Sequence, residues 1–339
     1  MTMRVSSMAS PLKQAFSNLA GPAGRRSFAT GTRLETNYGF IGLGQMGYPM
    51  ARNLRSKIAK TDTMYVHDVN PAMSEQLEKE VGNVKVVQSV REIAENSEII
   101  LTVLPAPHHV QNVFQQMLKG SAKTSTTRDR LFIDCSTIDP KSSAGVANAT
   151  HSSGQGKFVD APMSGGAVGA AAGTLTFMLG SSPDLVPRVT EVLKCMGKRV
   201  VHMGPQTSGL KGKLANNYLL ALNNIATCEA MNMGVKWGLD PTTLTDMINT
   251  ATGKCWPSEV NNPVPGVVEN SPASKDYKPG FGTALMLKDL KLALQAAAEA
   301  NVTPQLGEHA KNIYAAVAED EKCKDRDFSV VYRYIGGKE

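Results

Sequence analysis

A glycine-rich turn between an apolar strand and a helix limits the folds open to this chain. The apolar residues 38–43 predict a strand that runs into the turn, and the helical stretch 48–57 follows. The turn consists of Gly42, Leu43, Gly44, Gln45, Met46 and Gly47. The first glycine makes the bend, the second lets a ligand approach the backbone, and the third lets the helix pack on the strand.

Strand-like and helix-like segments alternate through the first part of the chain. We expect strands at 38–43, 63–67, 84–87, 99–104, 131–134, 158–160, 174–179 and 198–202. Helix-length segments separate them, and parallel neighbours need crossovers of that length. From residue 204 onward only helical patterns remain, at 210–239, 241–250, 283–301 and 304–320. The expected fold is α/β, a Rossmann-type doubly wound parallel sheet followed by an all-helical C-terminal domain.

An acidic residue after the second strand indicates which ligand the glycine turn binds. Asp68 follows the strand 63–67 and lies 21 positions beyond Gly47. Dinucleotide-binding folds place a carboxylate there to bind the adenosine ribose, while the phosphates lie at the helix N-terminus. Such a carboxylate repels the 2′-phosphate of NADP, and the next residue is Val69 rather than an arginine that would bind it. The sequence therefore predicts NAD as the cofactor.

The N-terminal segment 1–37 has the composition of a targeting leader. It is rich in Ser, Ala and Arg and holds five basic residues against one acidic residue. Such a segment is typical of a mitochondrial presequence, and the segment 26–29 resembles a presequence cleavage site. The alternative is an N-terminal tail without a targeting role. We expect a leader over 1–37, an NAD-binding domain over 38–203 and a helical domain for substrate binding and oligomerisation over 204–339.

Composition argues against several other functions. Without the leader the net charge falls from +6 to +2, which is too little to indicate a nucleic-acid surface. No apolar run approaches the ~18 residues that a membrane-spanning helix needs. The 6 histidines and 5 cysteines show no metal-ligand spacing, so we expect no metal site.

A polar stripe on the first helix of the C-terminal half is the strongest candidate for catalysis. Gly209, Lys213 and Asn217 recur at i, i+4 and i+8, so they share one helix face. Glycine permits close approach of a ligand, the lysine amine can exchange a proton, and the asparagine amide can orient a substrate. A solvated lysine face is the ordinary alternative, which we assign to Lys211, about 200° away around the helix. The pattern alone leaves both interpretations of Lys213 open.

Two other segments follow expected strands, where open α/β sheets bind ligands. The segment 134–140 presents the hydroxyls of Ser136 and Thr137. The segment 160–167 ends in a turn of small residues before the alanine-rich helix 167–172, whose free N–H groups could bind a carboxylate. Ordinary turn and helix-cap chemistry is the alternative for each segment.

Together these segments resemble the β-hydroxyacid dehydrogenases. The motifs that carry the resemblance are 39–53, 134–140, 160–166 and 213–217, and the resemblance covers residues 38–335. Four more segments are most similar to the family members that oxidise 3-hydroxyisobutyrate, namely 68–71, 255–256, 262–266 and 281–289. The sequence departs from the family pattern at Lys211-Gly212, where small residues are usual, and at His109, where an asparagine is common.

The resemblance implies a role for each matching residue. Lys213 would be catalytic, with Asn217 as its substrate-orienting partner. The substrate would lie against Ser136, Ser164, Gly165, Gly166 and Gly209. Thr137 would touch the nicotinamide end of the cofactor, and Lys288 would close over the cofactor from the helical domain. The cofactor contacts would be Gly42, Leu43, Gly44, Gln45, Met46, Gly47, Asp68, Leu104, Pro105, His109, Thr137 and Lys288.

The implied activity is the NAD-dependent oxidation of 3-hydroxyisobutyrate to methylmalonate semialdehyde in the mitochondrial matrix, a step of valine breakdown. The implied assembly is a homodimer or homotetramer. One alternative is an NADPH-dependent reductase of glyoxylate or succinic semialdehyde, which Asp68 disfavours. The other is an NAD-binding scaffold without turnover, which the joint presence of Lys213, Asn217 and Ser136 disfavours.

Overall fold

The computed structural model describes residues 35–119 and 130–339, so nearly all of the expected leader lies outside the described residues. Within these ranges nine strands form one sheet. The strands are β1 (Asn37–Ile41), β2 (Thr63–His67), β3 (Val84–Val86), β4 (Ile99–Thr102), β5 (Leu131–Asp134), β6 (Lys157–Asp160), β7 (Met163–Ser164), β8 (Leu175–Gly180) and β9 (Gly197–Gly204). The helices among them are α1 (Gly47–Lys57), α2 (Pro71–Glu80), α3 (Val90–Asn96), α4 (Pro107–Met117), α5 (Pro140–Ser152), α6 (Gly166–Ala172) and α7 (Val186–Leu193).

The strand order is β3-β2-β1-β4-β5-β6-β8, and both β7 and β9 pair with β8. All pairs from β3 to β6 are parallel, which confirms the Rossmann-type sheet. The far edge differs from the expectation, because β8 runs antiparallel to β6 and β9 follows β8. The chain continues from β6 into β7, which also pairs antiparallel with β8, and it reverses direction in the connection through α6. β7 has only two residues, which are too few to show the alternating pattern of a strand in the sequence.

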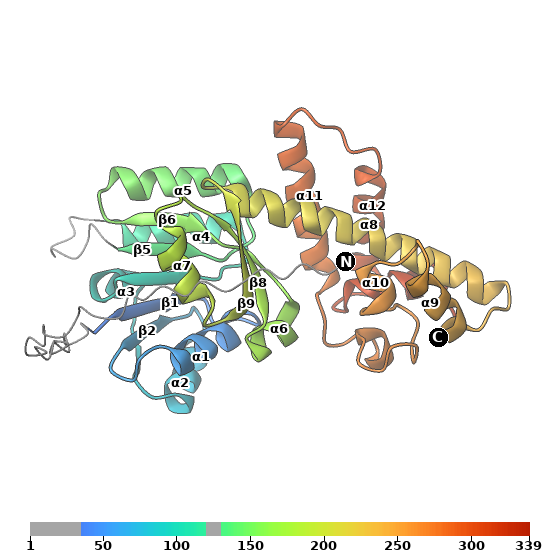
Figure 1. The fold of residues 1–339 in the computed structure, drawn as a ribbon, viewed down its shortest axis with the longest axis horizontal. Coiled ribbons are helices and arrows are strands. Elements are labelled where there is room, and N and C mark those ends of the chain that lie inside the picture. The colour runs from blue at the N-terminus through green and yellow to red at the C-terminus, as the bar shows by residue number, and fades with distance from the viewer. Residues whose placement is uncertain (1–34, 120–129) are drawn as a thin grey trace, which may run out of the picture. The chain divides into compact units, whose positions relative to one another are not determined.

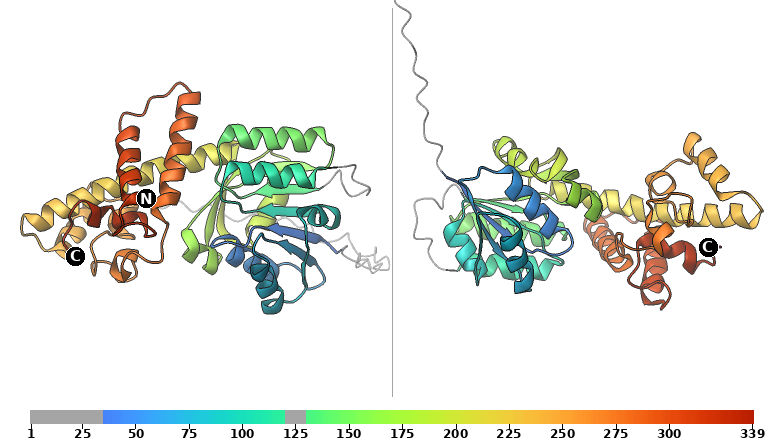
Figure 2. Two further views of the ribbon diagram at one scale, coloured as in Figure 1. Left: turned by 180° about the vertical axis from the view of Figure 1, so that it is seen from behind. Right: turned by 90° about the horizontal axis from the view of Figure 1, so that it is seen from below.

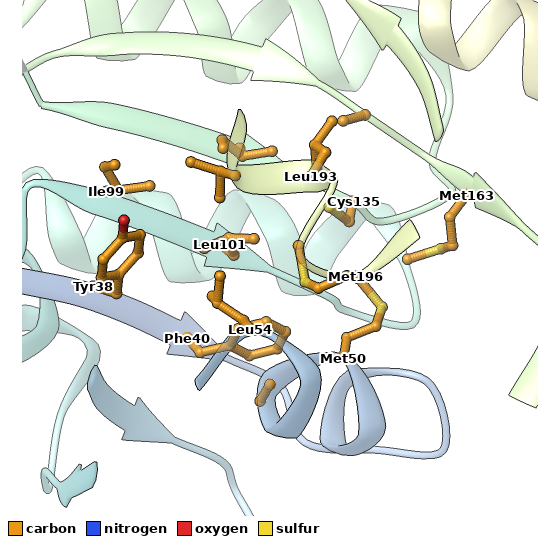
Figure 3. Close-up of a cluster of buried hydrophobic side chains, with 14 of the residues drawn as sticks. Tyr38, Phe40, Met50, Leu54, Ile99, Leu101, Cys135, Met163, Leu193 and Met196 are labelled. Carbon is orange, nitrogen blue, oxygen red and sulfur yellow. The ribbon is translucent and has the colours of Figure 1, made fainter. Parts of the chain in front are cut away.

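Helices cover both faces of the sheet, as a doubly wound fold requires. Phe40 packs with residues of α1, α2 and α7, whereas its neighbour Ile41 packs with residues of α3, α4 and α5. Successive side chains of a strand point to opposite faces, so a strand buried on both sides reads as a continuous apolar run. Figure 3 shows the first of these cores, with Phe40 beside Leu54 of α1.

The helical part begins with α8 (Ser208–Lys236), which contacts β8 and β9 and then α11 and α12 (Figures 1 and 2). The other helices are α9 (Pro241–Thr250), α10 (Trp256–Glu259), α11 (Thr283–Glu299), α12 (Gly307–Glu319) and α13 (Val331–Tyr334). Ile225 and Met231 of α8 pack against Leu290 of α11 and Tyr314 of α12 in a second core. The four long helices confirm the sequence expectation to within three residues at each end, whereas α10 lies between the helices expected at 241–250 and 283–301.

Candidate active site

The glycine turn has the backbone geometry that a bound phosphate requires. Gly42 has φ +93°, and a Cβ at this position would overlap the carbonyl oxygen of Val103. A Cβ on Gly47 would likewise overlap the carbonyl oxygen of Gly42. A Cβ on Gly44 would meet nothing within 4 Å, so no packing reason within the described structure requires a glycine there. The open space at Gly44 therefore fits a ligand approaching the backbone.

The N-terminus of α1 and the end of β2 complete this half of the site. No side chain caps α1 at Met46, and no acidic residue occupies its first turn. The helix dipole and the N–H groups are thus available to an anion. Asp68 accepts hydrogen bonds from the backbone N–H of Leu43, at 2.6 Å, and of Asn70, at 2.8 Å. Its carboxylate therefore lies against the glycine turn, where these residues fit a dinucleotide.

The loops after β4 and β5 lie together at the carboxyl end of the sheet. The backbone N–H of Leu104 donates to Oγ of Ser136 at 2.9 Å, and Ser136 is buried. Lys288 on α11 donates through Nζ to the carbonyl oxygens of Thr137, at 2.8 Å, and Pro105, at 3.4 Å. These contacts bring the helical part directly onto two loops that were both expected to contact the cofactor, with Thr137 at its nicotinamide end.

The stripe on α8 is buried, so Lys213 does not belong to a solvated lysine face. Gly209, Lys213 and Asn217 all lie on the covered face of α8, whereas Lys211 is exposed. Burial lowers the pKa of the Lys213 amine, and the positive charge of Lys288 lowers it further. Asp289 acts in the opposite direction, because its negative charge favours the ammonium form. A lysine in this setting can exchange a proton nearer to neutral pH than a solvated one.

Asp289 is a site residue that the sequence interpretation did not include. Its Oδ2 accepts a hydrogen bond of 2.6 Å from Nδ2 of Asn217, and its Oδ1 lies 3.1 Å from Nζ of Lys288. It is buried, with 3% of its surface exposed. The carboxylate of Asp289 thus connects Asn217 on α8 with Lys288 on α11. Its position directly after Lys288 in the segment 281–289 was the one available signal.

Other predicted residues are placed by their elements rather than by direct bonds. Ser164 ends β7, and Gly165 and Gly166 take positive φ angles of +134° and +62° at the start of α6. His109 is exposed on the first turn of α4, just beyond Leu104 and Pro105. In the described part of the chain, no hydrogen bond joins Ser164, Gly165, Gly166 or His109 to Lys213 or Asn217.

Two further observations concern other kinds of site. Across residues 35–119 and 130–339, no three His, Cys, Asp or Glu side chains gather as a metal ion would require. In the same ranges, no helix has both the length and the apolar character of a bilayer-spanning segment.

Two family profiles cover the described chain. The profile of the NAD binding domain of 6-phosphogluconate dehydrogenase matches residues 37–204, and the profile described as NAD-binding of NADP-dependent 3-hydroxyisobutyrate dehydrogenase matches residues 207–335. A relative from Dictyostelium discoideum, named a probable mitochondrial 3-hydroxyisobutyrate dehydrogenase, is 42% identical over 90% of this chain and 92% of its own length. The mouse mitochondrial 3-hydroxyisobutyrate dehydrogenase is 41% identical over 90% of this chain and 88% of its own.

The chain belongs to the β-hydroxyacid dehydrogenase family. Among solved structures, Mycobacterium tuberculosis 3-hydroxyisobutyrate dehydrogenase with L-serine is 37% identical, with a TM-score of 0.81 over 90% of this chain and 100% of the other. This dehydrogenase is therefore an NAD-binding oxidoreductase with a small-molecule substrate, and its N-terminal Rossmann-type domain is followed by a helical C-terminal domain.

A buried carboxyl group beneath the dehydrogenase site gives a pH-dependent stability. Asp134 ends β5, and its Oδ1 accepts hydrogen bonds from Oγ1 of Thr102, at 2.7 Å, and from the N–H of Ser136, at 3.1 Å. Its buried Oδ2 has no hydrogen-bond partner among the described residues. Burial raises the pKa of Asp134 from 3.8 to about 6. The folded protein therefore holds this proton more tightly than the unfolded chain does.

We expect Asp134→Asn to remove a pH dependence of folding stability. Between pH 4 and 7 the folded wild type binds more protons at this residue than the unfolded chain, so its stability falls as the pH rises. Relative to Asp134→Asn, the wild type should lose up to about 3 kcal/mol of unfolding free energy over this range. Urea unfolding of both proteins at several pH values measures the difference. A difference that stays constant with pH would contradict the assignment.

Proposed function

We propose that this dehydrogenase oxidises 3-hydroxyisobutyrate to methylmalonate semialdehyde with NAD, and that Lys213 accepts the hydroxyl proton. NAD, when bound, supplies the acceptor for the hydride that leaves C3. The observation that carries the proposal is a buried lysine whose pKa is lowered, on the same helix face as an asparagine held by a buried carboxylate. The amine accepts the proton in its neutral form, and in the reverse direction the ammonium returns it.

The substrate carboxylate would lie at the loop after β5. Oγ of Ser136 accepts a hydrogen bond from the N–H of Leu104, which fixes the hydroxyl oxygen at this loop. A serine hydroxyl can donate to a carboxylate. Ser164 and the backbone N–H groups of Gly165 and Gly166 would bind the same carboxylate from the other side. Gly209 would serve the site through close packing, because a Cβ there would overlap the carbonyl oxygen of Met178 on β8. Asn217 would orient the hydroxyl.

The cofactor would lie along the glycine turn. Gly42, Leu43, Gly44, Gln45, Met46 and Gly47 would bind the pyrophosphate, and Asp68 would accept from the adenosine ribose. Leu104, Pro105 and His109 would flank the cofactor along the loop after β4 and the start of α4. Thr137 would touch its nicotinamide end, and Lys288 would close over the cofactor from the helical part.

We infer the three segments 1–37, 38–203 and 204–339 as leader, NAD-binding domain and helical domain. The profile matches over 37–204 and 207–335 support this division. The leader's composition and the names of the relatives support a mitochondrial location, within which we propose the matrix. We further propose a homodimer or homotetramer. Large apolar side chains exposed from the end of α8 to α10 support an interface there, among them Trp237, Met247 and Trp256.

The proposed activity predicts a ranking of substrates and cofactors. With purified protein and NAD, 3-hydroxyisobutyrate should give a higher kcat/KM than serine or other short 3-hydroxy acids. NADH formation at 340 nm measures each rate. If the fastest reaction is the reduction of glyoxylate or succinic semialdehyde with NADPH, the reductase alternative replaces this proposal. If no combination of substrate and cofactor reacts, the protein is an NAD-binding scaffold without turnover.

Lys213→Ala should reduce kcat by about 10²–10⁴-fold, because the variant lacks the group that exchanges the proton. Binding of NAD, measured by calorimetry, should stay within about twofold of the wild-type value, because the amine lies outside the glycine turn. Lys211→Ala is the matched control, since it removes an exposed lysine two positions away on the same helix. A Lys213→Ala variant with the turnover of the control would refute the role of Lys213.

Asp68→Arg should shift the cofactor preference toward NADP. The substitution removes the carboxylate beside Leu43 and supplies a cation for the 2′-phosphate. The ratio of kcat/KM for NAD to that for NADP should fall at least about tenfold, which corresponds to roughly 1.4 kcal/mol. An unchanged ratio in the folded variant would remove Asp68 from the cofactor site.

A further inference from the structure

The helix that carries Lys213 begins without a cap of its own. Thr207 precedes the first residue of α8 at φ +79°, and its side chain makes no capping bond. A left-handed conformation costs a β-branched residue roughly 1–2 kcal/mol, so something outside the turn must hold it. Gly204, three residues earlier, also has a positive φ of +125°. The connection from β9 into α8 is therefore a sharp bend whose geometry is imposed by its surroundings.

The carboxylate of Asp160, at the end of β6, supplies the missing cap. Its Oδ1 accepts the N–H of Thr207 at 2.6 Å, and its Oδ2 accepts the N–H of Leu210 at 2.9 Å. Leu210 is the third residue of the helix, whose N–H a conventional cap residue would accept. The helix dipole also favours a negative charge at this end. Asp160 is fully buried, and it thus connects β6 to α8 across some fifty residues of sequence.

The fit between this carboxylate and α8 leaves no spare room. A Cβ on Gly180, the partner of Asp160 in the sheet, would overlap Oδ1 of Asp160. A Cβ on Gly209 would lie 2.9 Å from Oδ2 of Asp160 and would overlap the carbonyl oxygen of Met178 on β8. On the other side of the bend, Nε2 of Gln206 donates to Oγ of Ser143 on α5 at 2.9 Å. The first turn of α8 therefore packs against β6 and β8 too closely to shift along them.

The position of the first turn of α8 determines where the Lys213 amine lies. Lys213 is four residues after Gly209 on the same face, about 6 Å further along the helix axis. Asn217 follows after four more residues, and a helix transmits a displacement of its first turn to both side chains. We propose that Asp160 is a positioning residue for catalysis, which holds the first turn of α8 so that Lys213 and Asn217 meet the substrate. This inference rests on the proposed function and adds to it a residue outside the substrate and cofactor contacts.

The charge of Asp160 agrees with this role. Burial and the nearby carboxylate of Asp134 raise the pKa of Asp160, while the N–H groups of Leu210 and Thr207 oppose the rise, so the pKa is about 6. Above that pH the group is an anion that can accept both backbone bonds. An asparagine amide has the same size but only one accepting atom, so it cannot keep both.

Asp160→Asn tests the proposal. We expect kcat to fall about 10–100-fold, because a misplacement of roughly 1 Å can cost up to 10²-fold. The KM for NAD should stay within about threefold, since the glycine turn is untouched. The rate at which acetic anhydride modifies Lys213 in the free protein, relative to Lys211, should change at least about threefold. Mass spectrometry of the modified peptides measures this ratio without any turnover.

Asp62→Asn is the matched control, because Asp62 is a buried carboxylate before β2, at the opposite end of the strands. Its Oδ1 accepts the N–H of Thr36 at 3.1 Å. A merely structural role predicts that both variants lose stability alike and keep the wild-type kcat and Lys213 labelling. That result for Asp160→Asn would overturn the proposal.

A second variant covers the case in which Asp160→Asn does not fold. Gly209→Ala displaces the same turn by its Cβ and keeps the carboxylate. It should change the labelling of Lys213 in the same way, and wild-type labelling of Lys213 in this variant would overturn the proposal. If the wild type itself fails to oxidise 3-hydroxy acids with NAD, the proposed function fails, while the labelling ratio still shows whether Asp160 positions the amine.

Discussion

The burial of one amine connects the main features of this structure. Taking an ammonium group out of water is costly unless an opposite charge lies near, and the cost appears as a lowered pKa of Lys213. Asp289 moderates that cost, and Asn217 holds Asp289 in place through a bond of 2.6 Å. The lowered pKa makes the neutral amine easier to reach than in a solvated lysine, which favours proton exchange at this position.

Such a site exists only when the helical part is held against the carboxyl end of the sheet. One attachment is the pair of hydrogen bonds from the N–H groups of Thr207 and Leu210, at the start of α8, to Asp160. The other consists of the hydrogen bonds from Lys288 to the carbonyl oxygens of Thr137 and Pro105. Both use charged side chains on backbone groups, which give strong and directional bonds. Apolar packing alone tolerates small slides between helices, whereas these bonds fix a position.

Regular elements with a clear apolar period were predictable from the sequence. The strands 63–67 and 131–134 and the helix 241–250 coincide with β2, β5 and α9. The glycine turn and the carboxylate 21 positions beyond it follow from spacing alone, because a strand, a turn and a helix of fixed lengths bring them together. Short elements such as β7 and α10 were not predictable, since two or four residues do not complete a pattern.

The sequence alone determined three features: the order of strands and helices, the glycine turn, and the common face of Gly209, Lys213 and Asn217. Each of them depends on residues that are neighbours along the chain. Tertiary structure alone decided that this face is buried. Tertiary structure also decided which carboxylates bind to α8. Asp289 is 72 residues from its partner Asn217, and Asp160 is 50 residues from its partner Leu210. A pKa depends on burial and on charges that are near in space, and neither exists until the chain has packed.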